Sequence, residues 1–222
     1  MPRQARFVLP GVPHHITHRG VNRQVCFRDD QDHVFYLGLL EECSAVAGCR
    51  VHAYALMPNH VHVLATPEDE MGLFRFMKRV AQVYSQRHNR KNLRCGPVWE
   101  GRFKSTAIED EAYLMRCYRY IELNPVRAGI VSAPERYRWS SFGYNAEPST
   151  SWIVPHPLYL GLGNNPTERA ARYRRFVEEG MTAEELQAIR FATRSSLPLG
   201  SRELRRRLAM QVRGTSPGTS PG

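Results

Sequence analysis

The chain has 222 residues, of which 42% are hydrophobic and 23% charged, and this composition suits a globular domain with an appendage rather than a disordered chain. The sequence contains no apolar run of about 18 residues and no secretory signal pattern, so neither a transmembrane helix nor export is expected, and the cytoplasm is the expected location. The formal net charge of +10 favours a polyanionic partner, usually nucleic acid, over a basic surface that serves only solubility.

The first part of the chain predicts a strand, a helix and a β-hairpin. Alternation and β-branched residues predict a strand over His14–Asn22. Residues 29–48 begin with aspartates, continue with apolar residues at helical spacing and end in glycine, a pattern typical of a helix. The stretches RVHAYALM and HVHVLATP predict strands over residues 50–57 and 60–67, joined by a turn at Pro58-Asn59.

Two more helices and a fourth strand follow. An apolar stripe predicts a helix over Met71–His88, and Ser105–Ile108 is typical of a short strand. Acidic residues at 109–111 favour the start of a third helix, which should end near Asn124 because Pro125 disfavours helical geometry in the residue before it. The β-α-β-β-α-β-α order predicts an α+β fold of the split βαβ type: an antiparallel sheet with helices on one face, the other face being free to hold a site.

The composition changes after Ala133. Residues 134–166 are rich in proline, glycine and aromatic residues, which suggests irregular chain that wraps around a body. Three further helices are predicted, over Thr167–Glu179, Thr182–Thr193 and Ser201–Val212. The low-complexity end, GTSPGTSPG, is expected to be disordered.

Two histidines open the stretch MPNHVHVLATP. His60 and His62 are two apart in a strand, so their side chains share one face, about 7 Å apart along the backbone. Such a pair can close on one metal ion, although ordinary hydrogen-bonded histidines explain it equally well. Zinc would require a cysteine or a third histidine, and the five scattered cysteines form no CxxC pair, which indicates reduced structural thiols. Mg²⁺ or Mn²⁺ would take oxygen ligands instead, while a third histidine ligand stays open among His14, His15 and His18.

The third predicted helix carries a tyrosine and an asparagine one turn apart. Tyr120 and Asn124 differ by four positions, so they share a helical face. Asn124 offers a carbonyl oxygen and Tyr120 a phenol. Taken alone, the two residues also fit a half-buried packing residue and a helix cap before proline.

Three motifs connect these residues. MPNHVHVLATP, GPVWEGRFK and RYIELNPVRAG, in this order and at this separation, resemble the single-tyrosine HUH transposases. Within these they are most similar to the REP-associated tyrosine transposases, relatives of the insertion-sequence-200 type. The resemblance spans roughly residues 7–144 and implies a ferredoxin-like (RRM-like) fold. It also implies a catalytic domain at 1–144. The composition of the rest predicts an irregular wrap with a basic helical extension at 145–213 and a disordered tail at 214–222.

The same resemblance implies an active site and a substrate. Tyr120 would be the nucleophile, and His60, His62 and Asn124 would hold Mg²⁺ or Mn²⁺. The implied activity is that of a DNA transposase, which cleaves and transfers single-stranded DNA through a 5′-phosphotyrosine link. The expected DNA partner is a single strand beside a hairpin.

Other residues of the third helix compete for these roles. Tyr118 lies about 160° from Tyr120 around the helix and should face elsewhere, whereas Tyr113 lies nearly on the same face but two turns earlier. Tyr120 is therefore the preferred nucleophile. Glu122 lies about 160° from Asn124, which leaves no obvious general base.

Basic and aromatic residues on several elements are candidate DNA contacts: Arg19, Arg23, Lys78, Arg79, Trp99, Arg102, Phe103 and Lys104. Core packing explains the two aromatic residues equally well, and each cation alone fits a solvated surface.

Two other functions compete with the transposase. One is a non-catalytic nucleic-acid-binding module on the same fold. The other is an HUH nickase of plasmid replication or conjugation, which the family pattern disfavours, because the histidine strand precedes a single candidate tyrosine. The sequence is compatible with a monomer or a homodimer, and in a dimer the tyrosine of one copy could meet the histidines of the other.

Overall fold

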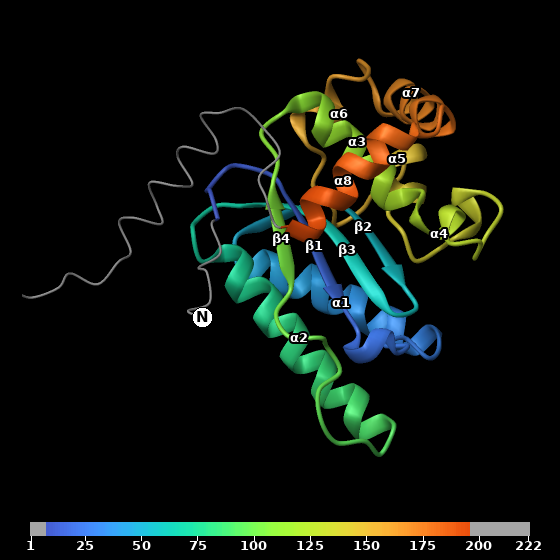
Figure 1. Cartoon of the computed structure of the whole chain (residues 1–222). Helices are drawn as coiled ribbons and strands as arrows, with labels where there is room; N and C mark the ends of the chain where they lie inside the picture. Colours follow the sequence, from blue (N-terminus) through green and yellow to red (C-terminus); the bar gives the residue numbers. More distant parts are fainter. Residues whose placement is uncertain (1–7, 196–222) are drawn as a thin grey trace, which may run out of the picture.

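A four-stranded antiparallel sheet forms the centre of the computed structural model, which describes residues 8–195 (Figure 1). The strands are β1 (His14–Arg19), β2 (Cys49–Met57), β3 (His60–Pro67) and β4 (Lys104–Ala107). They lie in the order β2-β3-β1-β4, so each of the two β-α-β units is split by a strand of the other. The predicted α+β fold with an antiparallel sheet is confirmed.

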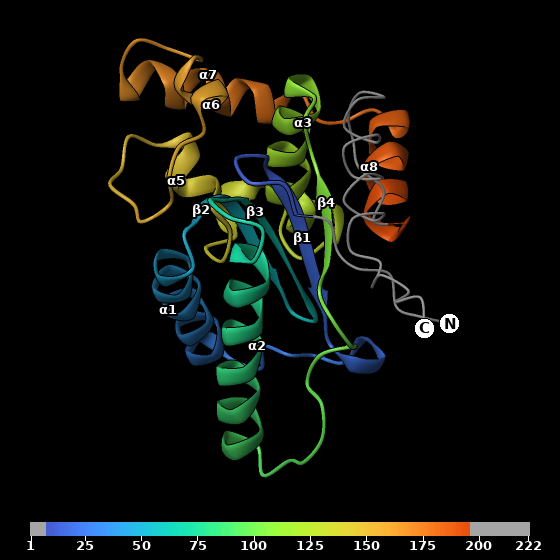
Figure 2. The same cartoon turned by 90° about the vertical axis from the view of Figure 1, so that its left-hand side faces the viewer.

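Helices cover both faces of this sheet (Figures 1 and 2). The first three are α1 (Asp30–Val46), α2 (Gly72–Lys91) and α3 (Glu111–Glu122). α1 and α2 share a core with Val61 and Val63 of β3, whereas α3 shares a second core with Leu64 of the same strand. The predicted packing of helices on one face only was wrong, because β3 buries both of its alternating sets of side chains and each face therefore needs a cover.

Two elements end earlier than the sequence predicts. β1 ends at Arg19, earlier than predicted, because residues 21–23 form a 3₁₀ turn. α3 ends at Glu122, and a separate short helix, α4 (Asn124–Arg127), follows it. Pro125 fits in α4 because the first turn of a helix needs no hydrogen bond from its backbone nitrogen.

The longer helices after residue 133 pack on the sheet face that α3 covers, whereas Trp139, Trp152 and Ile153 join the core of α1 and α2. The elements of this segment are η2 (Pro134–Arg136), α5 (Phe142–Ala146), α6 (Pro157–Leu160), α7 (Pro166–Glu178) and α8 (Ala183–Ser195). Phe142, Tyr173 and Ile189 belong to the same buried cluster as Leu64 of the sheet. The C-terminal helices and the sheet therefore share one core.

The predictions for the C-terminal part are met in part. α7 and α8 confirm two predicted helices, and the stretch predicted as irregular contains the short elements η2, α5 and α6. The helix predicted over Ser201–Val212 and the tail at 214–222 lie outside the described residues, and the domain division at residue 144 stays a prediction. Between residues 8 and 195, none of the helices combines the length and apolar character needed to cross a membrane.

A buried carboxylate joins α3 to the C-terminal helices. Glu122 is fully buried, and its Oε1 accepts hydrogen bonds from Ser141 Oγ (2.5 Å) and Asn145 Nδ2 (2.7 Å). Its Oε2 accepts a hydrogen bond from Tyr173 Oη (2.7 Å). Burial raises the pKa of Glu122 to about 7, whereas the three hydrogen bonds act in the opposite direction. The carboxylate is thus engaged in holding α5 and α7 against α3.

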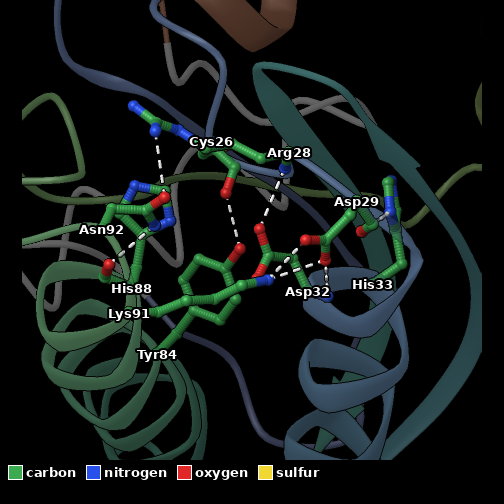
Figure 3. Close-up of polar contacts among 9 residues, drawn as sticks. All are labelled: Cys26, Arg28, Asp29, Asp32, His33, Tyr84, His88, Lys91 and Asn92. Carbon is green, nitrogen blue, oxygen red and sulfur yellow. Dashed lines mark hydrogen bonds and ion pairs between the residues drawn. The ribbon is translucent and has the colours of Figure 1, made fainter.

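An ion-pair cluster joins α1 and α2 on the other side of the sheet (Figure 3). Lys91 Nζ lies 2.7 Å from carboxylate oxygens of both Asp29 and Asp32. Asp29 also caps α1, since its Oδ1 accepts a hydrogen bond from Asp32 N at 3.1 Å. The cluster therefore ties the end of α2 to the start of α1.

Candidate active site

The two predicted histidine ligands lie on the sheet face that α3 covers. In the β1–β3 register, Arg19 is opposite His60 and Thr17 is opposite His62, and opposite residues of an antiparallel pair share a face. The ring centroids of His60 and His62 are 5.0 Å apart, with an angle of 79° between the ring planes. The strand thus presents both imidazoles side by side.

α3 brings Tyr120 to these histidines. The centroid of the Tyr120 ring lies 5.7 Å from that of His62 and 5.8 Å from that of His15, and Tyr120 is 7% exposed. All three rings belong to one chain. Tyr118 instead contacts Tyr173 in the core, at a centroid distance of 6.1 Å, so it faces elsewhere, as the helical geometry predicted.

The hydrogen bonds of His60 fix which of its ring nitrogens is free. Asn59 Nδ2 donates to Arg23 O (3.1 Å), so Asn59 Oδ1 is the atom that lies 2.6 Å from His60 Nδ1. His60 Nδ1 must then carry the proton, which leaves the lone pair on Nε2. Burial, with a smaller contribution from Arg19, lowers the pKa of His60 to about 4, so the ring is neutral at pH 7.

His15 of β1 contacts His62 directly. His15 Nε2 lies 2.9 Å from His62 Nδ1, and the two rings are stacked with their centroids 5.1 Å apart. Burial lowers the pKa of His15 to about 3 and holds the pKa of His62 well below its usual value, so both rings are neutral. The sequence analysis left His15 open as a ligand but missed this contact, which exists only because β1 lies beside β3.

Asn124, the third predicted ligand, begins α4. Its side chain is half-buried, and its buried Nδ2 has no hydrogen-bond partner among residues 8–195. The two neutral imidazoles offer nitrogen lone pairs that fit a divalent cation, and the side-chain oxygen of Asn124 stays the predicted third donor. In the described part of the chain, no group of three or more His, Cys, Asp or Glu side chains could hold a metal ion, so the candidate set depends on this amide.

Arg127 is a residue of the site that the sequence analysis did not identify. Its guanidinium carbon lies 4.4 Å from the centre of the Tyr120 ring, and its Nη2 donates a hydrogen bond to Tyr120 O (2.7 Å). Burial lowers the pKa of Arg127 to about 10, so the side chain stays a cation at neutral pH. A cation against the ring stabilises negative charge that develops on the phenol oxygen during a nucleophilic attack.

Four of the predicted DNA contacts are exposed cations. Arg19 lies on the histidine face of the sheet, Arg23 lies in the 3₁₀ turn after β1, and Arg102 precedes β4. Lys104 donates from Nζ to Arg194 O (3.2 Å), so it also holds the end of α8. Of these cations, Arg19 is the one beside the histidine pair, where it is exposed and can contact a phosphate.

The other four predicted contacts lie away from Tyr120. Trp99 and Phe103 are each 6% exposed and belong to the core beneath α1 and α2, where the Trp99 ring stacks on His18 at 4.5 Å. Core packing, the alternative for these two aromatic residues, is what the structure shows. Lys78 and Arg79 are exposed on α2, on the opposite side of the sheet from α3. A role of these four in DNA binding stays a prediction.

Comparisons with known proteins agree with this arrangement. The family model described as "Transposase IS200 like" matches residues 10–124, a span that contains both histidines, Tyr120 and Asn124. No curated protein matches the chain. A solved structure of a REP-associated tyrosine transposase bound to a REP hairpin is 19% identical and covers 71% of this chain and 93% of its own, with a TM-score of 0.58.

A second solved structure, of a proposed transposase from Deinococcus radiodurans, is 18% identical and covers 62% of this chain and 98% of its own. Its TM-score of 0.37 is too low to support an argument. At 19% identity, the first solved structure supports the fold alone.

Proposed function

Because the chain belongs to the IS200-like transposase family, which implies transposase-type DNA cleavage, we propose that it cuts and rejoins single-stranded DNA through a covalent bond to Tyr120. The observation that carries this proposal is the position of the Tyr120 ring, 5.7 Å from that of His62 within one chain. A non-catalytic binding module would have no need for a phenol, two neutral imidazoles and a buried cation at one place.

In the proposed reaction, Tyr120 Oη attacks the scissile phosphorus. A bond forms between Oη and phosphorus, the bond from phosphorus to the 3′-oxygen breaks, and the proton lost by the phenol is balanced by the proton gained by the 3′-hydroxyl. The product is a 5′-phosphotyrosine, which a later 3′-hydroxyl can attack to rejoin strands. One phosphodiester is exchanged for another, so no nucleotide hydrolysis is required. Arg127, against the Tyr120 ring, stabilises the charge that develops on Oη.

The residues that would hold a divalent cation, Mg²⁺ or Mn²⁺, are His60, His62 and Asn124. When bound, such a cation supplies positive charge that polarises and orients a phosphate. The chain's own contribution is to keep both imidazoles neutral by burial and to direct the His60 lone pair to Nε2 through the hydrogen bond to Asn59. Low exposure of Tyr120 and His62 also limits competition from water.

The proposed substrate is single-stranded DNA beside a hairpin. The net charge of +10 supports a polyanionic substrate, and Arg19 offers a phosphate contact on the histidine face. The hairpin is proposed by analogy with the solved REP-associated tyrosine transposase, whose own ligand is a REP hairpin. The cytoplasmic location stays a prediction.

Removal of divalent cations is expected to abolish covalent attachment to DNA, because the histidines and Asn124 alone leave the phosphate charge uncompensated. The substrate is a pool of labelled single strands, each with a hairpin flanked by randomised bases. The measurement is a denaturing gel with Mn²⁺, with EDTA, and with EDTA followed by excess Mn²⁺. A covalent band that is indifferent to EDTA would remove the cation from the proposal. A salt-sensitive complex without any covalent band would support the non-catalytic binding module instead.

A mixture of two inactive variants is expected to remain inactive. Tyr120→Phe lacks the nucleophile and His62→Ala lacks a ligand, and the structure brings both residues together within one chain. A mixed dimer therefore contains no complete site. The same gel measures the result after the two variants have been denatured and refolded together. A covalent band on the His62→Ala chain would show that the tyrosine acts on the site of a partner copy.

A further inference from the structure

The hydrogen bond between His15 and His62 can run in either of two directions. His15 Nε2 and His62 Nδ1 are 2.9 Å apart, both rings are buried, and a single proton lies between the two nitrogens. If His15 donates, the proton of His62 sits on Nε2, and that nitrogen cannot bind a cation. If His62 donates from Nδ1, its Nε2 carries a lone pair, the state that Asn59 imposes on His60.

Thr193 of α8 decides between these directions. Its Oγ1 lies 2.8 Å from Ile189 O and 3.4 Å from His15 Nδ1. The carbonyl oxygen can only accept, and 2.8 Å is the usual length of a hydroxyl-to-carbonyl hydrogen bond, so the Thr193 proton is directed to Ile189 O. Toward His15 the hydroxyl can then only accept, over a long hydrogen bond of 3.4 Å, which favours the proton of His15 on Nδ1. In that tautomer His15 Nε2 is an acceptor, and His62 Nδ1 donates.

We propose that His15 and Thr193 are positioning residues that hold His62 in its Nδ1–H tautomer and keep the Nε2 lone pair free for a divalent cation. A hydrogen bond donated by the ring nitrogen that does not bind the metal orients a metal-binding histidine and increases the basicity of its other nitrogen. The inference rests on the proposed cation-binding role of His60 and His62. Neither Thr193 nor the rest of α8 lies within residues 10–124, which the family model matches, so a C-terminal helix outside that span completes the site.

The end of α8 is fixed on the sheet by two further hydrogen bonds. Thr106 Oγ1 donates to Ala192 O (3.2 Å), and Lys104 Nζ donates to Arg194 O (3.2 Å). Both acceptors flank Thr193 in α8. β4 therefore sets the position of the Thr193 hydroxyl over His15.

The first test is the tautomer of His62 in the unaltered protein without metal. Long-range ¹⁵N–¹H correlation spectra of ¹⁵N-histidine-labelled protein, assigned with the His62→Ala variant, distinguish a protonated ring nitrogen from an unprotonated one. We expect Nδ1 of His62 to be protonated and Nε2 to be unprotonated. A proton on Nε2 would overturn the proposal whatever the protein does to DNA.

The second test is the affinity of the protein for Mn²⁺, measured by calorimetry without DNA. His15→Phe keeps a ring in the stack but removes the acceptor, and we expect the Mn²⁺ dissociation constant to rise about 10–100-fold. Thr193→Val should weaken binding in the same direction, and Thr193→Ser, which keeps the hydroxyl, should restore it. His14→Phe is the matched control, because His14 is buried in the same strand but on the opposite face, and its affinity for Mn²⁺ should not change.

The outcomes separate this inference from the proposed function. If His62→Ala loses Mn²⁺ binding while a folded His15→Phe binds it unchanged, the positioning role is wrong and the cation site stands. If His62→Ala binds Mn²⁺ like the unaltered protein, the cation site is wrong, and the tautomer measurement still decides the state of His62. Should His15→Phe fail to fold, the Thr193→Val and Thr193→Ser pair gives the same comparison.

Discussion

Tyr120→Phe is expected to abolish the covalent protein–DNA band while leaving DNA binding nearly unchanged. The substitution removes only the phenol oxygen, which is the proposed nucleophile. The ring stays, and with it the contacts to His62 and to the Arg127 guanidinium, so the fold of the site should be kept. The measurement compares the covalent band on a denaturing gel with the complex on a native gel, at equal protein concentrations.

Tyr113→Phe is the matched control for this experiment. Tyr113 lies on the same helix and is half-buried, but the ring contacts of His62 and His15 are made by Tyr120. Its variant should form the covalent band as the unaltered protein does. If the band persists in Tyr120→Phe and disappears in Tyr113→Phe, the nucleophile is Tyr113, and the mechanism proposed for Tyr120 is wrong.

Glu122→Ala is expected to destabilise the folded chain by about 3 kcal/mol or more, because each buried donor left without an acceptor costs about 1–3 kcal/mol. The three donors are Ser141, Asn145 and Tyr173, all buried around the carboxylate. Glu122→Gln keeps the volume and one acceptor oxygen, and it should cost about 1 kcal/mol. Urea unfolding followed by circular dichroism measures both values. An equal, small loss in both variants would show that the carboxylate does not hold the helices.

The same pair of variants gives a pH dependence with a defined sign. Burial raises the pKa of Glu122 in the folded chain from 4.5 to about 7, so the folded state binds its proton more tightly than the unfolded state. The contribution of Glu122 to stability is therefore fully present below pH 4.5 and is lost as the pH rises through about 7. Relative to Glu122→Gln, the unaltered protein should lose stability over that interval. No change in the difference would mean that the three hydrogen bonds balance the effect of burial on the pKa, and a gain in stability with pH would mean that they outweigh it.

The order of elements was predictable because strong local patterns mark each one. The cover on the second face of the sheet was not predicted, since the order of elements favours helices on one face, and the His60 and His62 side chains suggested that the other face is free to hold a site. In the structure α3 covers that face of the sheet. The residues that pack against α3, such as Tyr173, come from far along the chain. Long-range packing of this kind leaves no periodic signal in a single strand.

The site was predictable to the extent that its residues follow local spacing or the family motifs. His60, His62 and Tyr120 meet as the sequence predicted, although their chemical roles stay predictions. The contact between His15 and His62 was missed because it depends on the register of β1 against β3, and Arg127 was missed because its position depends on the short helix α4. Trp99 was assigned equally to stacking and to packing because it lies in a loop with several basic residues, whereas its neighbours in space are aromatic residues of α1 and α2.

The buried carboxylate of Glu122 has a consequence for how DNA reaches the site. It lies two residues after Tyr120 on the same short helix, and three hydrogen bonds attach it to α5 and α7. Any shift of the α3 backbone that carried Tyr120 outward would have to break these three buried hydrogen bonds. The proposed nucleophile is therefore attached to a fixed helix, and we expect the DNA strand to bend in order to reach it.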